Sequence, residues 1–281
     1  METFLSNSSE NENIRANSMP NAVSAPDSWI GLQRYTSARI AIGRTGGSQR
    51  TPSILDFRLA HARARDAVHA TFNPEELAKK FAEAGFESVI LHTPIRDKQT
   101  YLMNPDMGRV LDEDSKKKLR ELAKNWKGRD FAVIVSDGLS ATAANLNAVD
   151  TVKALAEFLP EREWAMTPII IVPFARVKIQ DAIGEEIGIR HAIVLIGERP
   201  GLGSPDSLSA YFTHKPVWKT VESDRNCVSN IRPLGMPPRL AAKKLAMLLK
   251  ESLALGISGT ALKDNIDDSQ LLDESKNKKL M

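Results

Sequence analysis

The stretch HAIVLIGERPGLG, His191–Gly203, decides the fold class. It begins with an unbroken apolar run, Ala192–Ile196, and then becomes a glycine-rich loop that also holds Glu198 and Arg199. A strand that is covered on both faces is apolar at every position, whereas a strand with one solvent-exposed face alternates between apolar and polar residues. The run therefore predicts a buried strand. The loop after it is a place where a ligand can approach the backbone.

Two further strands, with helices between them, extend this pattern along the chain. Strands are expected in RDFAVIVSDG, residues 129–138, and in TPIIIVPF, residues 167–174. Helices are expected at about 141–158, 177–188 and 237–256. Alternating strands and helices imply right-handed crossovers and a parallel sheet. We therefore predict an α/β fold whose main domain is a Rossmann-like, mostly parallel sheet.

The N-terminal part of the chain has a different pattern. Apolar residues recur with helical spacing in residues 51–72, and Asn73, Pro74 and Gly85 are start and stop signals for a second helix. Both ends of the chain are polar, which predicts disorder. The expected domains are a disordered tail over 1–28, a mainly helical domain over 29–112, the Rossmann-like domain over 113–258 and a disordered tail over 259–281.

Composition limits the class of protein. The 281-residue chain has a formal net charge of +3 and a single cysteine, Cys227. One cysteine excludes an internal disulfide and fits a reducing compartment. No apolar run is long enough for a transmembrane helix, and the first residues lack the basic start and apolar core of a secretion signal. We expect a cytoplasmic protein without a membrane or nucleic-acid partner.

Three loops are expected to meet where a ligand of such a fold binds. Ligands of open α/β sheets bind beyond the carboxyl ends of the strands, which are followed here by Ser136–Ser140, Pro173–Lys178 and Gly197–Gly203. The spacing in GERPGLG is G-x-x-x-G-x-G. That spacing is neither the dinucleotide fingerprint nor the phosphate-binding loop. The loops indicate a binding site without saying which ligand it takes.

Catalytic and metal-binding patterns are not evident in the sequence. Ser140 stands where the nucleophile of a strand–turn–helix elbow would stand, but Thr142 replaces the second glycine. We therefore interpret Asp137 as a loop acid and Ser140 as a helix N-cap. Cys227 has no cysteine near it at zinc-ligand spacing, and the histidines form no close pair on one helix face. They are His61, His69, His92, His191 and His214. We predict no catalytic residue and no metal ligand in this chain.

Two other interpretations stay open on the residues alone. One is a free-standing nucleotide-binding α/β enzyme, although the dinucleotide fingerprint is missing. The other is an RNA- or DNA-binding module, although Tyr35 is the one aromatic residue near the start of the arginine-rich segment on which bases could stack. The arginines of that segment are Arg34, Arg39, Arg44, Arg50, Arg58, Arg63 and Arg65.

Six stretches, taken together and in order, resemble one known family. They are YTSARIAIGRTG, DKQTYLMNPDMGRVL, VIVSDGLSA, FARVKIQDAIGE, VLIGERPGLGSPDSLSAY and VESDRNCVSNI. Each is weak alone, but six in register are specific. The chain closely resembles the small (light) chain of ethanolamine ammonia-lyase from about Trp29 to Ile257.

The resemblance implies a function shared between two kinds of chain. Members of this family convert ethanolamine to acetaldehyde and ammonia by a radical mechanism that uses adenosylcobalamin. The large subunit binds ethanolamine and carries the catalytic residues, and the small subunit covers the cobalamin from the other side. The resemblance therefore implies a large subunit as partner in a hetero-oligomer. No histidine here follows an aspartate by two residues, as the Asp-x-His-x-x-Gly ligand motif requires, so a base-on cofactor is expected.

Family residues that contact the cobalamin match Val177, Glu198 and Cys227 in this sequence. Glu198 would accept hydrogen bonds from the amide groups around the corrin, with an ion pair to Arg199 or a neighbouring residue as the alternative. Val177 would offer an apolar face and backbone polar groups, and Cys227 would make close van der Waals contact. Simple packing is the alternative for both.

Two further expectations come with the resemblance. The glycines in the loop 197–203 have no side chains to obstruct a ligand, so the corrin edge would reach the backbone. Some relatives use an amphipathic N-terminal segment to enter a bacterial microcompartment. The first residues of this chain have only scattered apolar side chains, so the expected location is the cytoplasm, with a microcompartment left open.

Overall fold

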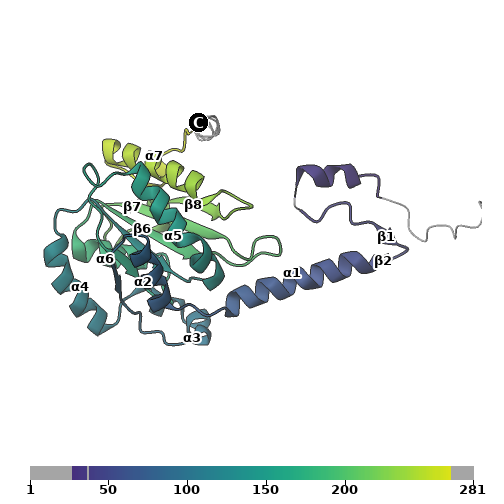
Figure 1. Ribbon diagram of the computed structural model, residues 1–281, viewed down its shortest axis with the longest axis horizontal. Helices are drawn as coiled ribbons and strands as arrows, with labels where there is room; N and C mark the ends of the chain where they lie inside the picture. Colours follow the sequence, from purple (N-terminus) through teal and green to yellow (C-terminus); the bar gives the residue numbers. More distant parts are fainter. Residues whose placement is uncertain (1–26, 37, 267–281) are drawn as a thin grey trace, which may run out of the picture. The chain divides into compact units, whose positions relative to one another are not determined.

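The computed structural model describes residues 27–36 and 38–266, which form two compact units that divide between His61 and Ala62 (Figure 1). Nearly all of the predicted tail over 1–28, and residues 267–281 of the other tail, lie outside the described residues. Within the described part, no helix has both the length and the apolar character needed to span a lipid bilayer.

The first unit has little core of its own. It contains the 3-10 helix η1 (Ile30–Tyr35), the antiparallel pair β1 (Arg44–Thr45) and β2 (Ser48–Gln49), and the start of α1 (Thr51–His69). The helix predicted within residues 51–72 is therefore confirmed. Large apolar side chains of this unit are exposed: Trp29, Ile30, Leu32, Tyr35, Leu55, Phe57 and Leu59. The unit thus offers apolar surface to its surroundings.

The described part of the second unit is built on one mixed six-stranded sheet. Its strands in chain order are β3 (Ser88–Ile90), β4 (Phe131–Ser136), β5 (Ile169–Ile171), β6 (His191–Gly197), β7 (Leu208–His214) and β8 (Asn226–Ile231). Their order in the sheet is β3-β5-β4-β6-β7-β8. The first four of these are parallel, and β7 and β8 join antiparallel. The α/β class and the three predicted strands are confirmed, while β3, β7 and β8 were not predicted.

Helices cover both faces of this sheet (Figure 1). One face carries α2 (Pro74–Glu83), α5 (Ala141–Phe158) and α7 (Pro238–Leu255). The other carries α4 (Glu113–Trp126) and α6 (Ile179–Ile187). The short segments are α3 (Lys98–Met103), η2 (Pro105–Arg109), η3 (Glu222–Asp224) and η4 (Gly259–Ala261). The helices predicted at 141–158, 177–188 and 237–256 are confirmed.

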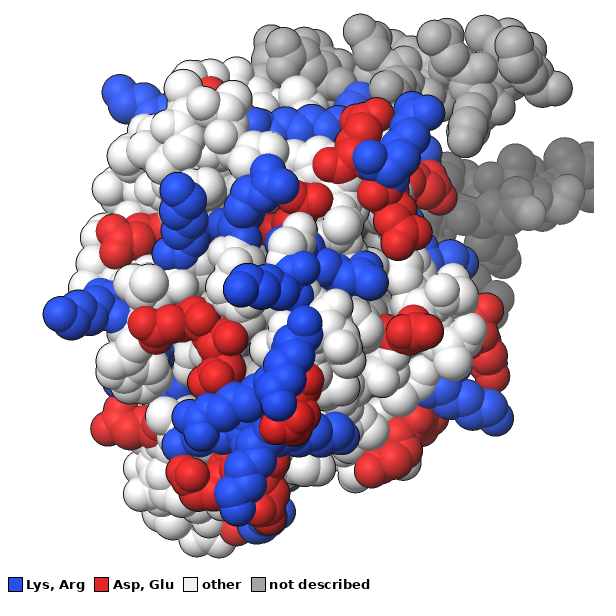
Figure 2. Space-filling view, turned by 90° about the vertical axis from the view of Figure 1, so that its left-hand side faces the viewer, with Lys and Arg blue, Asp and Glu red and all other residues white. Residues whose placement is uncertain are grey.

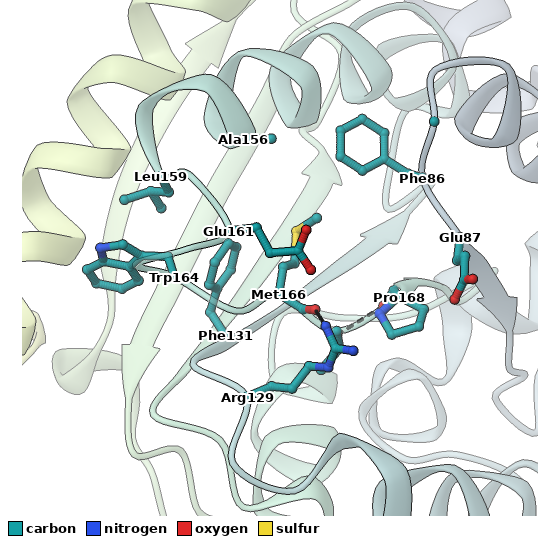
Figure 3. Close-up of a pocket in the computed structure, with 12 residues that line it drawn as sticks. Phe86, Glu87, Arg129, Phe131, Ala156, Leu159, Glu161, Trp164, Met166 and Pro168 are labelled. Carbon is teal, nitrogen blue, oxygen red and sulfur yellow. Dashed lines mark hydrogen bonds between the residues drawn. The ribbon is translucent and has the colours of Figure 1, made fainter.

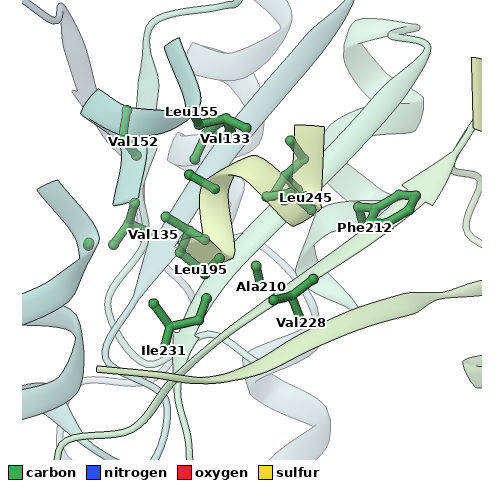
Figure 4. Close-up of a cluster of buried hydrophobic side chains, with 14 of the residues drawn as sticks. Val133, Val135, Val152, Leu155, Leu195, Ala210, Phe212, Val228, Ile231 and Leu245 are labelled. Carbon is green, nitrogen blue, oxygen red and sulfur yellow. The ribbon is translucent and has the colours of Figure 1, made fainter. Parts of the chain in front are cut away.

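Alternate residues of β4 divide the core into two layers. Val133 and Val135 face α5 and α7, whereas Ala132 and Ile134 face α4 and α6. Every residue of β4 is buried, which explains why its apolar run does not alternate. Figure 4 shows the first layer, whose side chains include Val152, Leu155, Leu195, Ala210, Phe212, Val228, Ile231 and Leu245. Each large aliphatic side chain so buried contributes about 1.5–3 kcal/mol.

Segments outside the predicted sheet domain take part in the second unit. β3 pairs with β5, so one strand of the sheet lies N-terminal to the boundary expected at residues 112 and 113. The expected domain division stays a prediction. In the predicted C-terminal tail, Leu262 is buried in the core layer of α5 and α7, and Asp264 lies 2.5 Å from Lys244 Nζ. The chain therefore stays packed beyond residue 258.

His191, the first residue of β6, is buried and neutral. Its Nε2 lies 3.0 Å from Ser252 Oγ and 3.1 Å from His214 Nδ1. Because Ser252 Oγ donates to the carbonyl of Ile257 at 2.6 Å, we assign the Nε2 proton to His191. Burial, followed by the influence of His214 and Arg190, lowers the pKa of His191 to about 3.

This histidine predicts a loss of stability in weak acid. In the unfolded chain His191 titrates near its ordinary pKa of about 6.5, so between that pH and 3 the unfolded state binds more protons. The stabilisation is complete above about pH 6.5 and decreases as the pH falls. We expect a loss of about 1.6 kcal/mol between pH 6.5 and 5, because one pKa unit corresponds to about 1.4 kcal/mol and the unfolded histidine is already half protonated at pH 6.5. Urea unfolding at both pH values measures it.

Two variants separate this effect from the titration of other groups. His191→Asn should have a smaller difference in unfolding free energy between pH 6.5 and 5 than the natural chain. His61→Asn, at an exposed position of α1, should keep the full difference. An unchanged pH dependence in His191→Asn would contradict the assignment.

Candidate functional site

A pocket of about 520 Å³ lies where β4, β5 and β6 end. It brings together the three predicted site residues Val177, Glu198 and Cys227, which come from separate segments of the chain. The other lining residues are Tyr101, Gly138, Leu139, Arg176, Ile196, Gly197, Arg199, Ser209, Tyr211 and Ser229. All three loops that were expected to meet at the carboxyl ends of the strands contribute to this pocket.

The antiparallel strands β7 and β8 form the floor of the pocket. Along β7, Leu208, Ala210 and Phe212 enter the core. Neighbouring side chains of a strand point to opposite faces, so Ser209 and Tyr211 point to the pocket side. The alternation LSAYFT, residues 208–213, was the available sequence signal for this strand.

Glu198 is held in place by three donors. Its Oε2 accepts a hydrogen bond from Ser207 Oγ at 2.8 Å, and its Oε1 accepts from Ser209 Oγ and, at 3.0 Å, from the backbone N–H of Asn230. The structure shows no ion pair between Glu198 and Arg199, both of which are described residues. Because each carboxylate oxygen has about two acceptor sites, Oε2 can accept one more hydrogen bond.

Val177 and Cys227 line the same pocket as Glu198. Val177 is half-buried and packs against the core layer of α4 and α6. The Cys227 thiol is exposed at the pocket, and Sγ lies 3.8 Å from Ser209 Oγ. The protein around the thiol still excludes enough water to raise the pKa of Cys227 above its ordinary value, chiefly by desolvation. Desolvation also raises the pKa of Tyr211, the register partner of Cys227, to about 12.

Arg176 and Tyr101 form another wall of the pocket. The Cζ atom of Arg176 lies 3.9 Å from the centroid of the Tyr101 ring, and Nη2 donates to the carbonyl of Tyr101 at 2.8 Å. Tyr101 is buried, and burial raises the pKa of its hydroxyl. Neither residue was predicted for the site, since an arginine and a tyrosine in separate segments carry no local motif.

Asp137, at the end of β4, is buried behind this pocket. Its Oδ1 accepts the N–H of Phe174 at 2.7 Å, and its Oδ2 lies 3.3 Å from Lys98 Nζ. Burial raises the pKa of Asp137, against the opposing influence of Lys98. These contacts connect the loop after β4 with the loop after β5, so Asp137 shapes the pocket.

Ser140 closes the loop after β4 as the N-cap of α5. Its Oγ accepts the N–H of Ala143 at 3.2 Å and donates to the carbonyl of Pro205 at 2.8 Å. The predicted N-cap is therefore confirmed. The loop passes so close to Gly197 that a Cβ there would lie 2.8 Å from the carbonyl carbon of Ser140. Gly197 thus serves backbone packing between the two loops.

Another pocket, of about 390 Å³, lies at the opposite ends of β4 and β5 (Figure 3). Phe131, Leu159 and Trp164 supply apolar walls, and Arg129 donates from Nη1 to the carbonyl of Met166 at 2.5 Å. None of the predicted site residues lines it. The pocket beside β6 is therefore the candidate site.

The face that carries α4 has charges of both signs side by side (Figure 2). Lys116 lies 2.7 Å from Glu113, and Lys124 lies 2.7 Å from Glu121. Exposed pairs of this kind contribute little stability and are typical of a solvated surface. Among the described residues, no three His, Cys, Asp or Glu side chains gather closely enough to hold a metal ion.

Comparison with known proteins identifies relatives over most of the chain. Residues 26–263 match the family model of the ethanolamine ammonia-lyase light chain (EutC). The ethanolamine ammonia-lyase small subunit of Azotobacter vinelandii is 44% identical over 244 residues, which are 86% of this chain and 90% of the relative. That of Pseudomonas fluorescens is 43% identical, over 87% of this chain and 89% of the relative. That of Pseudomonas putida is 42% identical, over 91% of this chain and 95% of the relative.

Proposed function

Since this chain belongs to the ethanolamine ammonia-lyase light-chain family, we propose that it is the small subunit of that two-chain enzyme and that its pocket binds one edge of adenosylcobalamin. The observation that supports this most is that Val177, Glu198 and Cys227 line one pocket. The same three residues match the cobalamin-contacting positions of the family, which is an independent argument from the sequence. Their assignment to the cofactor is a proposal.

The residues of the pocket fit the edge of a corrinoid. Glu198 Oε2 can accept a hydrogen bond from an amide N–H, and such amides surround the corrin ring. Val177, Leu139 and Ile196 offer apolar surface for a flat ring. A volume of about 520 Å³ is typical of a site for a drug-sized ligand, and a cobalamin is larger. This chain would therefore cover only part of it.

The cofactor would supply radical chemistry through homolysis of its cobalt–carbon bond. The residues of this chain bind and orient. Cys227 stays a neutral thiol at pH 7 because its pKa is raised, which suits contact with a ring edge and does not suit metal ligation. We propose base-on binding, because no histidine of the sequence stands in the Asp-x-His context.

The apolar surface of the first unit supports assembly with a large subunit. Leu55 and Phe57 of α1 are two positions apart, which places them on opposite sides of the helix, and both are exposed. A helix with apolar side chains on several sides is typically buried among other parts of a protein or complex. We propose that the large subunit covers this surface and that ethanolamine binds mainly to the large subunit.

We also propose that the enzyme acts in the cytoplasm. Any microcompartment signal in 1–26 lies outside the described residues.

The test is reconstitution with the large subunit from the same source. Acetaldehyde release is measured with adenosylcobalamin and ethanolamine for each chain alone and for the mixture. We expect activity only in the mixture, because this chain supplies binding residues and the large subunit supplies catalytic ones. Activity of this chain alone would contradict the proposal and favour a free-standing nucleotide-binding α/β enzyme.

Variants of the same complex connect the activity to the pocket. Glu198→Gln removes the charge and should weaken adenosylcobalamin binding about tenfold or more, as a hydrogen bond to a charged group is worth about 1.5–3 kcal/mol. Glu83→Gln, at an exposed position of α2, should bind like the natural chain. Equal affinity of the Glu198→Gln complex and the natural complex would remove Glu198 from the site.

A further inference from the structure

Arg176 lines the candidate pocket and has a hydrogen-bond donor that the protein does not use. Its Nη2 donates to the carbonyl of Tyr101, but its Nε is buried and has no hydrogen-bond partner in the structure. A buried donor without a partner is unfavourable, because it has lost its hydrogen bonds to water and no hydrogen bond within the protein replaces them. A ligand that accepts from this guanidinium would remove that cost.

The Arg176 side chain is held on a rigid support. Its backbone N–H donates to the carbonyl of Gly108 at 2.7 Å. The Tyr101 ring lies against the guanidinium, and its hydroxyl donates to the carbonyl of Ala175 at 3.2 Å. A Cβ at Gly108 would lie 2.8 Å from the carbonyl oxygen of Phe174 and 2.9 Å from Arg176 Cγ. Only glycine therefore allows η2 to pack this closely, and the guanidinium is positioned before any ligand binds.

The charge around Arg176 favours an anionic ligand group. Arg199 also lines the pocket, and Lys98 Nζ lies 5.0 Å from the centroid of the same Tyr101 ring, where it balances the buried carboxylate of Asp137 at 3.3 Å. The one carboxylate in the lining, that of Glu198, accepts hydrogen bonds from Ser207, Ser209 and the backbone N–H of Asn230, which offset part of its negative charge. The planar fork of an arginine matches the oxygens of a phosphate.

We infer that Arg176 is a further ligand-binding residue, whose guanidinium donates hydrogen bonds to a phosphate of the bound cofactor. The inference rests on the proposed function, because a cobalamin that keeps its own nucleotide base carries a phosphate in that nucleotide. Glu198 and Arg176 then have opposite tasks. Glu198 accepts from amide groups at the ring edge, and Arg176 donates to the nucleotide.

The test compares two ligands on the complex of this chain with the large subunit. One is hydroxocobalamin, and the other is cobinamide, a corrinoid that lacks the nucleotide and its phosphate. Binding is measured by equilibrium dialysis with the visible absorption of the corrin, so it does not depend on activity. Arg176→Met should weaken hydroxocobalamin binding about 10- to 100-fold and cobinamide binding by less than about threefold.

Further variants complete the test. Arg176→Lys keeps the positive charge but loses the planar guanidinium, which can donate two parallel hydrogen bonds. Its hydroxocobalamin affinity should therefore lie between those of Arg176→Met and the natural complex. Arg109→Met, in the exposed part of η2, should bind both ligands normally. Retained cobinamide binding also shows that the Arg176→Met pocket is folded.

Each contrary result has a defined meaning. Equal weakening of both ligands would overturn the assignment to the phosphate and favour an amide carbonyl of the ring as the acceptor. Unchanged hydroxocobalamin affinity in Arg176→Met would overturn the role of Arg176 while leaving the proposed function intact. A natural complex that binds neither ligand would overturn the proposed function, and this inference with it.

Discussion

Replacing Gly197 by alanine is expected to lower the free energy of unfolding by about 3 kcal/mol, near the upper end of what overpacking normally costs. A Cβ at Gly197 would lie 2.8 Å from the carbonyl carbon of Ser140, and it would also meet the carbonyl oxygens of Ser140 and Asp137. These are backbone atoms of the loop after β4, so they cannot move aside as the end of a flexible side chain can.

Gly138, in the loop after β4, is equally close to the loop that contains Gly197. Gly138 has φ +51°, and a Cβ there would lie 3.1 Å from the backbone nitrogen of Gly197. The loops after β4 and β6 therefore pack backbone against backbone, and Glu198 follows directly. A larger residue at 197 should also displace Glu198 and weaken the cofactor binding that we propose for this pocket.

Urea unfolding followed by circular dichroism measures the Gly197→Ala effect. Gly203→Ala is the matched control, because nothing lies within 4 Å of a Cβ built there. It should unfold within about 0.5 kcal/mol of the natural chain. Equal stability of the two variants would show that the loops can separate at no cost, contrary to the packing seen here.

Breaking the buried ion pair between Asp181 and Arg225 is expected to cost about 3–5 kcal/mol. Asp181 on α6 is fully buried, and Arg225, just before β8, donates from Nη2 to its Oδ2. Burial raises the pKa of Asp181 despite the opposing influence of Arg225, so the carboxylate depends on its partner. Arg225→Met would leave Asp181 with Lys178, whose Nζ lies 3.5 Å away.

A double-mutant cycle separates the broken pair from the lost packing. Asp181→Leu combined with Arg225→Met should be more stable than Arg225→Met alone, because the double variant also removes the buried carboxylate that Arg225→Met leaves with only the longer contact to Lys178. Arg239→Met is the control, since Arg239 and Glu157 form an exposed pair that should contribute about 0–1 kcal/mol. The urea midpoints of all variants are compared. Additive losses in the cycle would contradict coupling between the two residues.

The Asp181–Arg225 pair also bears on the site. It ties α6 to the residue that precedes β8, and β8 supplies Cys227 and the backbone N–H of Asn230. Loss of the pair should therefore loosen the floor of the pocket. Activity of the reconstituted enzyme should fall in Arg225→Met and recover in part in the double variant.

The sequence by itself determined the elements whose signals are local. The central strands β4, β5 and β6 are apolar at nearly every position, because helices cover both faces of the sheet. The caps are equally local. Asn73 accepts the N–H groups of Glu75 and Glu76, and Ser140 accepts that of Ala143, as their positions before the helices predict. The family too could be identified from motifs in order along the chain.

The three predicted site residues are a mixed case. The resemblance selected them, and the structure places them in one pocket, but their contact with a cofactor stays a prediction. The alternative expected for Glu198 is an ion pair with Arg199 or another neighbour. Its actual partners come from positions 207, 209 and 230, on or beside β7 and β8. No local pattern could have named them.

Only the tertiary structure decided how the remaining parts meet. β3 has three residues, too few to show a period, and it joins the sheet by pairing with β5. The antiparallel addition of β7 and β8 turns Ser209, Tyr211 and Cys227 toward one pocket. Local periodicity reports which face of an element is buried. Which elements pair, and which donors such as Arg176 Nε are left without a partner, depends on contacts between residues far apart in the chain.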